Sequence, residues 1–305
     1  MNPFATFVQL VLDGLAQGSL YAALALAIVI VNQATGLINF AQGGMAVLGA
    51  YIGVTAAGIA IPVIGREAGI VAGIIVALAA SFGIAAVIER YLMRRFERAE
   101  EDTKVVVTIG LLTLISGFMG IVWGFNYIPY EFFINGRETP IQIGGISISV
   151  WSLTTFLTIV GLMIILQILF RGTKLGLGLR SVADNPQSAA LSGVRVGGMR
   201  MIGWGLAAVL GTAAAILLAS KAQLFPYNFD GILVYALAAV LIGGLDSPIG
   251  AVVAAWGIAI LESLAGVYVP FIGHDLKVIV PFVLVFIVLI VRPQGLFGRK
   301  VVVRV

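Results

Sequence analysis

The sequence predicts an all-α polytopic membrane protein, and three observations support this prediction. Of its 305 residues, 60% are hydrophobic and only 10% are charged, whereas soluble domains carry about 25% charged residues. Uncharged runs long enough to cross the hydrocarbon of a bilayer, about 20 residues each, recur along the whole chain. The 38 glycines, together with many alanines, are the small residues that let transmembrane helices approach one another closely.

Apolar runs divide the chain into about eight segments. The first run, 14–65, holds no charged residue over 52 positions, which is enough for two crossings with a break at 31–44. The later runs are 68–88, 105–125, 149–170, 201–220, 231–265 and 276–291. No linker or low-complexity stretch lies between them, so we expect residues 1–305 to form a single transmembrane domain.

The distribution of basic residues predicts which loops face the cytoplasm. Fourteen of the eighteen Lys and Arg residues lie in three segments, 90–104, 171–200 and 292–305. Loops rich in Lys and Arg stay in the cytoplasm when a membrane protein inserts. We therefore expect all three segments, and the C-terminus with them, on that side. The same count puts the N-terminus outside, unless a re-entrant piece near residue 40 reverses it.

The sizeable loop expected on the outer side is 126–148. Its Asn135-Gly136 dipeptide and the alternating sequence at 141–148 predict a small hairpin. A shorter outer stretch holds the lone histidine, His274. We expect that stretch to be a solvated loop, with contact to an external partner as the alternative.

The run at 231–265 is expected to be a broken hairpin. A single crossing there would put the basic C-terminus outside, whereas a turn near 242–251, rich in Gly and Pro, returns the chain to the same side. A polar, Gly-rich interruption at 39–44 resembles it. Paired interruptions of this kind predict a translocation path. The candidate path residues are Asn39, Gln42, Gly43, Gly44, Gly243, Gly244, Asp246 and Ser247.

The basic segment 171–200 holds a short helix with readable ends. Asn185 can cap it, Pro186 suits its first position, and Gly193 can end it. A compact helix on the cytoplasmic face of a many-spanning protein is typical of a docking element for a soluble partner. The pattern therefore indicates a transporter that is driven by another subunit.

Several function classes are excluded or disfavoured. The chain has no cysteine and one histidine, so we expect no disulfide, no metal site and no cofactor. Its basic residues lie in loops between apolar runs, which argues against nucleic-acid binding. No G-x-x-x-x-G-K-[ST] run occurs, so ATP would be bound by partner subunits. The apolar runs also hold no acids paired at helical spacing, so we expect no enzymatic activity.

A set of motifs carries a family resemblance. In chain order they are GSLYAALALA (18–27), GLINFAQGGMAVLGAY (36–51), IERY (88–91), TIGL (108–111), LRSVADNPQSAALSGV (179–194), GGLDSPIGA (243–251) and RPQGLFG (292–298). Together they cover nearly the whole length. The chain resembles the smaller permease subunit, of the LIV-H type, of the branched-chain amino-acid ABC importers.

This resemblance implies an ATP-driven importer for branched-chain or other hydrophobic amino acids in a bacterial or archaeal cytoplasmic membrane. The chain would form half of the translocation path beside a second, longer permease subunit. Two ATPase subunits and a periplasmic or lipid-tethered substrate-binding protein would complete the complex, embedded in membrane lipids. The short helix would insert into the ATPase, and the resemblance assigns this coupling role to Arg180, Ala183, Asp184, Pro186, Ala189, Ala190 and Gly193.

Alternatives remain at this stage. An ABC permease of the same architecture can carry urea or an amide, and an ion-coupled secondary transporter needs buried acids such as Asp13, Asp246 or Glu262. Asp246 suits helix capping as well as substrate contact. Glu262 suits contact with an Arg of another subunit or with a backbone donor. Asn32 and Gln33 fit the end of a helix as well as a path wall.

Overall fold

The computed structural model describes residues 3–97, 99–133, 139–143, 145–271 and 276–298. Within them, seven helices are long and apolar enough to cross a membrane: α1 (Pro3–Thr35), α2 (Gln42–Ile64), α3 (Arg66–Tyr91), α4 (Glu101–Trp123), α5 (Val150–Gly172), α8 (Val196–Ala222) and α10 (Pro248–Tyr268). Two apolar helices are shorter, α9 (Asp230–Gly243) and α11 (Ile279–Val291). The all-α polytopic prediction is confirmed, whereas the number of segments that cross the bilayer stays a prediction.

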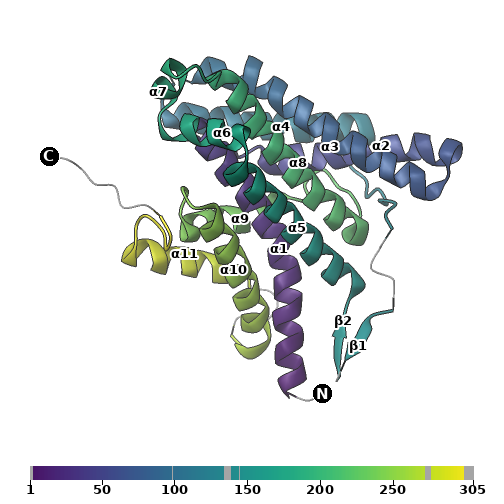
Figure 1. The fold of residues 1–305 in the computed structure, drawn as a ribbon. Coiled ribbons are helices and arrows are strands. Elements are labelled where there is room, and N and C mark those ends of the chain that lie inside the picture. Colours follow the sequence, from purple (N-terminus) through teal and green to yellow (C-terminus); the bar gives the residue numbers. More distant parts are fainter. Residues whose placement is uncertain (1–2, 98, 134–138, 144, 272–275, 299–305) are drawn as a thin grey trace.

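The remaining elements are short and lie between the apolar helices (Figure 1). They are the 3-10 helix η1 (Met93–Phe96), the polar helices α6 (Lys174–Asp184) and α7 (Pro186–Leu191), and the strands β1 (Ile141–Ile143) and β2 (Ile146–Ile148). The strands pair antiparallel, with Ile141 opposite Ile148, which confirms the small hairpin predicted from the alternating sequence. Asn135, Gly136 and His274 lie outside the described residues.

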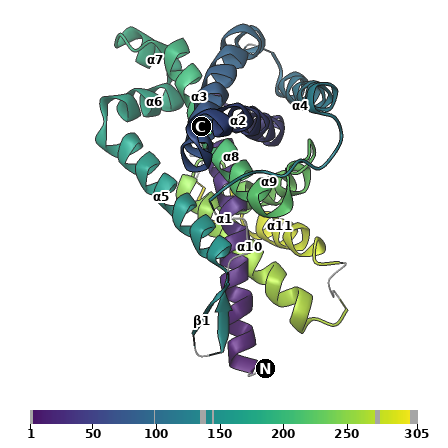
Figure 2. The same ribbon diagram turned by 90° about the vertical axis from the view of Figure 1, so that its right-hand side faces the viewer.

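Helix α1 runs through the middle of the molecule in both views (Figure 1, Figure 2). Its residues 18–31 are buried, because α8, α9 and α10 all pack against it. Small residues of α1 allow this close packing of helices. A Cβ atom added at Gly14 would lie 2.8 Å from Ile260 Cα, and one added at Gly18 would lie 2.9 Å from Ala259 Cβ. The backbones of α1 and α10 therefore touch without side chains between them.

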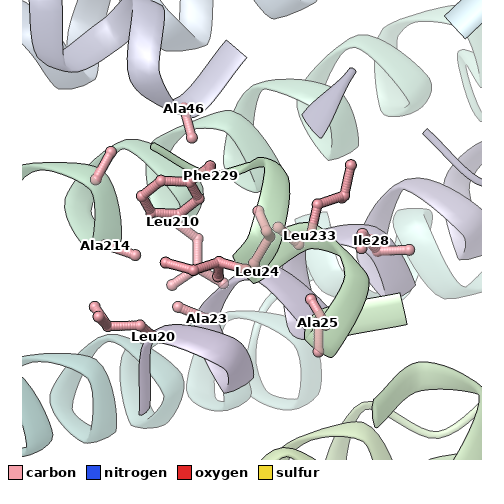
Figure 3. Packing of buried hydrophobic residues seen from close by; sticks show 14 of the residues in the cluster. Leu20, Ala23, Leu24, Ala25, Ile28, Ala46, Leu210, Ala214, Phe229 and Leu233 are labelled. Carbon is pink, nitrogen blue, oxygen red and sulfur yellow. The ribbon is translucent and has the colours of Figure 1, made fainter. Parts of the chain in front are cut away.

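The apolar core is built around the second half of α1. Figure 3 shows Leu24 and Ile28 of α1 beside Leu233 of α9, Leu210 of α8 and Phe229, the residue before α9. Helices α1, α8 and α9 thus share one cluster of buried side chains. Packing in this cluster holds these helices together in the middle of the molecule.

The α9–α10 hairpin is broken at residues 244–247, inside the predicted turn. Gly244 has a φ of 101°, which favours glycine. The Ser247 hydroxyl accepts a hydrogen bond from the Gly250 amide at 3.0 Å, and Pro248 takes the first helical position. Ser247, rather than Asp246, therefore caps α10. With 14 residues α9 is about 21 Å long, shorter than a hydrocarbon core of about 30 Å.

The segment 292–298 closes the end of this hairpin. The Leu296 amide donates to the Ile242 carbonyl at 2.7 Å, and the Phe297 amide donates to the Gly243 carbonyl at 3.2 Å. These bonds satisfy carbonyls that the end of α9 leaves free. The described part of the third basic segment, residues 292–298, thus lies against the α9–α10 turn.

The two ends of the bundle carry different short elements. At one end the Gln9 side chain of α1 accepts a hydrogen bond from the Ser147 amide of β2 at 3.0 Å. At the other end lie α6 and α7, and the Arg94 side chain of η1 reaches the Gly197 carbonyl at 2.9 Å. Figure 1 shows the N-terminus and the β-hairpin far from α6 and α7. This arrangement fits the predicted grouping of basic segments on one side.

We predict that Gly49→Val destabilises the subunit. Gly49 of α2 faces the hydroxyls of Ser81 and Thr212, which bond each other at 2.8 Å, so a side chain there would push α3 and α8 apart. Overpacking of this kind costs about 1–3 kcal/mol. The measurement is the melting temperature in detergent. Gly58→Val is the matched control, because the Gly58 position of α2 faces open space; equal melting temperatures for the two variants would contradict the packing at Gly49.

Candidate functional site

The basic segment 171–200 contains two helices where one was predicted. Helix α6 begins after Thr173, whose hydroxyl accepts a hydrogen bond from the Gly176 amide at 3.1 Å. It buries Gly176, Leu179 and Val182, which recur every third residue on one face. The expectation of a single short helix is therefore incomplete. A capping threonine followed by this spacing is the signal that could have revealed α6.

Helix α7 has the ends that the sequence predicted. The Asn185 side chain accepts a hydrogen bond from the Ser188 amide at 2.9 Å, and Pro186 is the first helical residue. Gly193, just after the helix, has a φ of 84°. The Val194 amide then donates to the Ala189 carbonyl at 3.0 Å. The cap, the proline and the terminating glycine are all confirmed.

The predicted coupling residues divide between two faces of these helices. Ala189 is buried against the subunit itself, whereas Ala183, Ala190 and Gly193 are exposed. Next to Ala190, Leu191 is 92% exposed. A single exposed apolar side chain is common on proteins, but this one lies on the helix for which the sequence predicts docking. Sequence reasoning missed Leu191, although an apolar residue closing a polar helix was visible.

A cavity of about 930 Å³ brings the two predicted sets of residues together. It lies between α6, the start of α7, the ends of α1 and α5, and the α9–α10 turn. Its wall includes the predicted coupling residues Arg180, Ala183, Asp184 and Pro186 and the predicted path residue Asp246. Residues that are 62 positions apart, Asp184 and Asp246, thus face one space.

Charges of both signs line this cavity. Arg171, Arg180 and Arg200 supply guanidinium groups, and Asp184 and Asp246 supply carboxylates. Gln33 also lines it and donates its side-chain amide to the Asp246 carbonyl at 3.2 Å, which ties α1 to the α9–α10 turn. Much of the remaining wall consists of apolar side chains, namely Leu26, Ile30, Met163, Leu166, Phe170, Leu177 and Ile249. Such a space suits a small solute with separated charges and an apolar body.

The interruption at 39–44 lies elsewhere. Asn39 and Gln42 are fully buried, bond each other at 3.2 Å, and Gln42 donates to the Ala207 carbonyl of α8 at 3.0 Å. Gly43 packs on Phe229, and Gly44 packs on a leucine of α4. As far as the described residues define the cavity wall, these four residues are not part of it. Their role in a path stays a prediction.

The glycines of the α9–α10 turn serve close packing. A Cβ atom at Gly243 would collide with the backbone of Gly250, and one at Gly244 would lie 2.8 Å from the Gly298 amide nitrogen. Gly243, Gly244 and Ser247 lie beside Asp246 but are not in the described cavity wall. Of the path residues predicted in this turn, Asp246 is the one that the described cavity wall includes.

Glu262 of α10 finds its partners inside the subunit. The hydroxyls of Tyr21 and Tyr235 donate to its carboxylate at 3.3 and 3.1 Å, and the Lys277 ammonium lies 3.7 Å away. The two tyrosine rings stack with centroids 4.6 Å apart. This buried acid is paired as a buried charge must be, by side chains rather than by the backbone donor considered from the sequence. Among the described residues, no group of three or more His, Cys, Asp or Glu could hold a metal ion.

The long apolar helices, the broken hairpin and the exposed short helix define a polytopic membrane permease subunit. A family model described as "Branched-chain amino acid transport system / permease component" matches residues 10–289. The chain therefore belongs to this family, and the resemblance drawn from the sequence motifs is confirmed.

Known relatives match over nearly the whole length. The "High-affinity branched-chain amino acid transport system permease protein LivH" of Escherichia coli (strain K12) is 25% identical over 308 residues and covers 99% of each chain. The "Probable branched-chain amino acid transport permease protein LivH" of Methanocaldococcus jannaschii is 25% identical, over 95% of this chain and 92% of its own. "High-affinity branched-chain amino acid transport system permease protein BraD" of Pseudomonas aeruginosa is 24% identical over 98% of each.

We predict that Asn185→Ala loosens α7 without unfolding the bundle. The change removes the side-chain acceptor for the Ser188 amide, which costs about 1 kcal/mol. Amide hydrogen exchange across 186–191 should then be about fivefold faster. Gln187→Ala, at an exposed position of the same helix, is the control and should leave exchange unchanged. Equal protection in both variants would show that Asn185 does not hold the helix.

Proposed function

We propose that this chain is a permease subunit of an ATP-driven ABC importer that takes up branched-chain or other hydrophobic amino acids. The observation that carries the proposal is the shared cavity: α6, the first residue of α7 and the turn of the broken hairpin form parts of one wall. A movement of α6 and α7 would therefore change the shape of the space that the turn borders. The names of the full-length relatives support the substrate class.

The proposed partners follow from what the chain offers and what it lacks. No phosphate-binding G-x-x-x-x-G-K-[ST] run occurs in the sequence, so ATP is bound by two partner ATPase subunits. Ala190 and Leu191 of α7 contact them. A second, longer permease subunit provides the other half of the path, and a substrate-binding protein delivers the solute from outside.

The cavity wall suits an amino acid. Its carboxylates can receive an ammonium group, its guanidinium groups can receive a carboxylate, and its apolar side chains match an aliphatic body. In the proposed orientation the cavity opens at the cytoplasmic end, since the basic segments gather there. The C-terminus is then cytoplasmic, and the complex belongs in a bacterial or archaeal cytoplasmic membrane.

The experiment that tests the function is purification of the tagged chain in mild detergent, followed by reconstitution. We expect a second permease and two ATPase subunits to copurify, and we expect leucine uptake into liposomes to require ATP and the binding protein. A chain that purifies alone and carries solute without ATP would overturn the proposal in favour of a secondary transporter. Uptake of urea or an amide in place of leucine would keep the importer but change its substrate.

We predict that Ala190→Glu abolishes coupling. The change places an unpaired carboxylate in the docking surface, and burying such a charge costs several kcal/mol. Uptake and substrate-stimulated ATP hydrolysis should fall together, while the amount of subunit inserted in the membrane stays the same. Ala190→Ser, which adds little volume and no charge, is the control. Normal transport by Ala190→Glu would rule out docking through α7.

We also predict that Asp246→Asn slows uptake several-fold while ATPase subunits still copurify. The change removes a negative charge from the cavity but keeps the size of the side chain. Initial uptake rates in liposomes measure the effect. Glu131→Gln removes a carboxylate from an exposed ion pair with Arg66 and serves as control. An unaltered uptake rate for Asp246→Asn would show that the solute does not depend on the Asp246 charge in the cavity on its way across the membrane.

A further inference from the structure

A second group of charges holds the base of α8 against the connection between α3 and α4. Glu89, in the last turn of α3, has a side chain that is only 1% exposed. Arg94 of η1 grips it with two bonds, from Nη2 to Oε2 at 2.8 Å and from Nε to Oε1 at 3.4 Å. The same Nη2 donates to the carbonyl of Gly197 in the first turn of α8 at 2.9 Å. One guanidinium therefore joins three elements.

A second ion pair reinforces this contact one turn along α8. Arg200 Nη1 lies 2.6 Å from Glu97 Oε1, and the Arg200 side chain is 10% exposed. Gly197 and Arg200 are three residues apart and share a face of α8. We call Glu89, Arg94, Glu97 and Arg200 the charge clamp. The charge clamp links the end of α3 and the α3–α4 connection to Gly197 and Arg200 of α8.

The backbone of α8 is shaped to accept Arg94. A Cβ atom at Gly197 would lie 2.8 Å from Arg94 Nη2 and 2.9 Å from its Cζ. Any side chain at this position would displace the guanidinium from the Gly197 carbonyl. Glycine is therefore required for the contact itself, rather than for backbone conformation.

The clamp lies next to the docking helix along the chain. Residues 192–195 alone separate the end of α7 from the start of α8. A displacement of α7 is therefore carried directly into the first turn of α8. The clamp ties that turn to α3, and α3 packs along α2 and α8. The clamp thus connects the docking helix to the α2–α3 hairpin, which is not part of the described cavity wall.

Buried charges are an expensive way to hold two helices together. Apolar side chains of the same volume often hold them as well or better, whereas paired charges fix one arrangement. The Glu89 carboxylate is buried, whereas the Glu97 side chain is 48% exposed, so the clamp specifies geometry more than it adds stability.

We propose that Glu89, Arg94, Glu97 and Arg200 are positioning residues for energy coupling. They hold the base of α8 so that movement of α7 by the ATPase is transmitted to α3 and α2 as well as to the cavity. This inference rests on the proposed importer function, which it extends to a second route of transmission. Without the clamp the base of α8 moves alone, so ATP hydrolysis continues while transport per ATP falls.

The test is charge reversal in the complete, reconstituted complex. Glu97→Arg and Arg200→Glu are each expected to lower the ratio of leucine uptake to ATP hydrolysis about tenfold. The double variant Glu97→Arg/Arg200→Glu restores an ion pair and is expected to recover most of the ratio. A purely structural loss would lower the melting temperature and the yield of complex, not this ratio.

Matched controls separate the clamp from charge reversal in general. Arg66, the first residue of α3, forms an exposed ion pair with Glu131 at 3.2 Å, at the end of α3 opposite to the clamp, and reversing either charge is expected to leave the ratio unchanged. Arg94→Lys keeps the charge but loses the two-bond grip, and should have a smaller effect than Arg94→Gln. Arg94 and Glu97 are not in the described cavity wall, whereas Arg200 lines it, so the Arg94 and Glu97 variants report on the clamp rather than on solute contact.

Two results would overturn the inference. One is a wild-type ratio in Glu97→Arg and Arg94→Gln; the other is a double reversal that folds, binds its ATPase subunits and recovers nothing. If Glu97→Arg does not fold, Glu97→Gln takes its place with the same expectation. Failure of the importer function itself would appear earlier, as wild-type protein that shows no ATP-driven uptake.

Discussion

The close approach of α1 to its neighbours is the contact on which the rest of the structure depends. Inside a bilayer, helices gain little from the hydrophobic effect and associate through van der Waals packing. Gly14 and Gly18 let α10 lie directly on α1, and Gly203 brings α8 against Ala34. Because α1 is surrounded along 18–31, its end at Thr35 fixes where α6 and the α9–α10 turn can meet. The cavity is thus located by glycines that do not line it.

Breaks in helices are stable here because other parts of the chain satisfy the exposed backbone. The Ser247 hydroxyl accepts a hydrogen bond from one amide of α10, and amides of the segment 292–298 donate to the last carbonyls of α9. Such interruptions at membrane depth persist only when they are buried or face water. The α9–α10 turn meets both conditions, since its glycines are buried and Asp246 faces the cavity. The link between α1 and α2 is buried at Asn39 and reaches the cavity at Gly36, directly after α1.

Local chemistry made part of this structure predictable. Hydrophobic runs located the long helices, and Asn185 with Pro186 and Gly193 marked the ends of α7, because caps depend on residues within one turn. The family motifs located the segment for which we propose a docking role. The charge clamp was not predictable, because Arg94 and Gly197 are 103 positions apart and no local pattern joins them. For the same reason the sequence could not show that Asp246 and not Gln42 reaches the cavity.

The exposure of Leu191 has a consequence for the assembly of the subunit. Burying a leucine side chain is worth about 1.5–3 kcal/mol, and at 92% exposure almost none of that is realised by the lone chain. In the docking that we propose, this free energy is gained only when an ATPase subunit covers α7. The lone subunit keeps an apolar side chain in water, so burial of Leu191 favours assembly over separation.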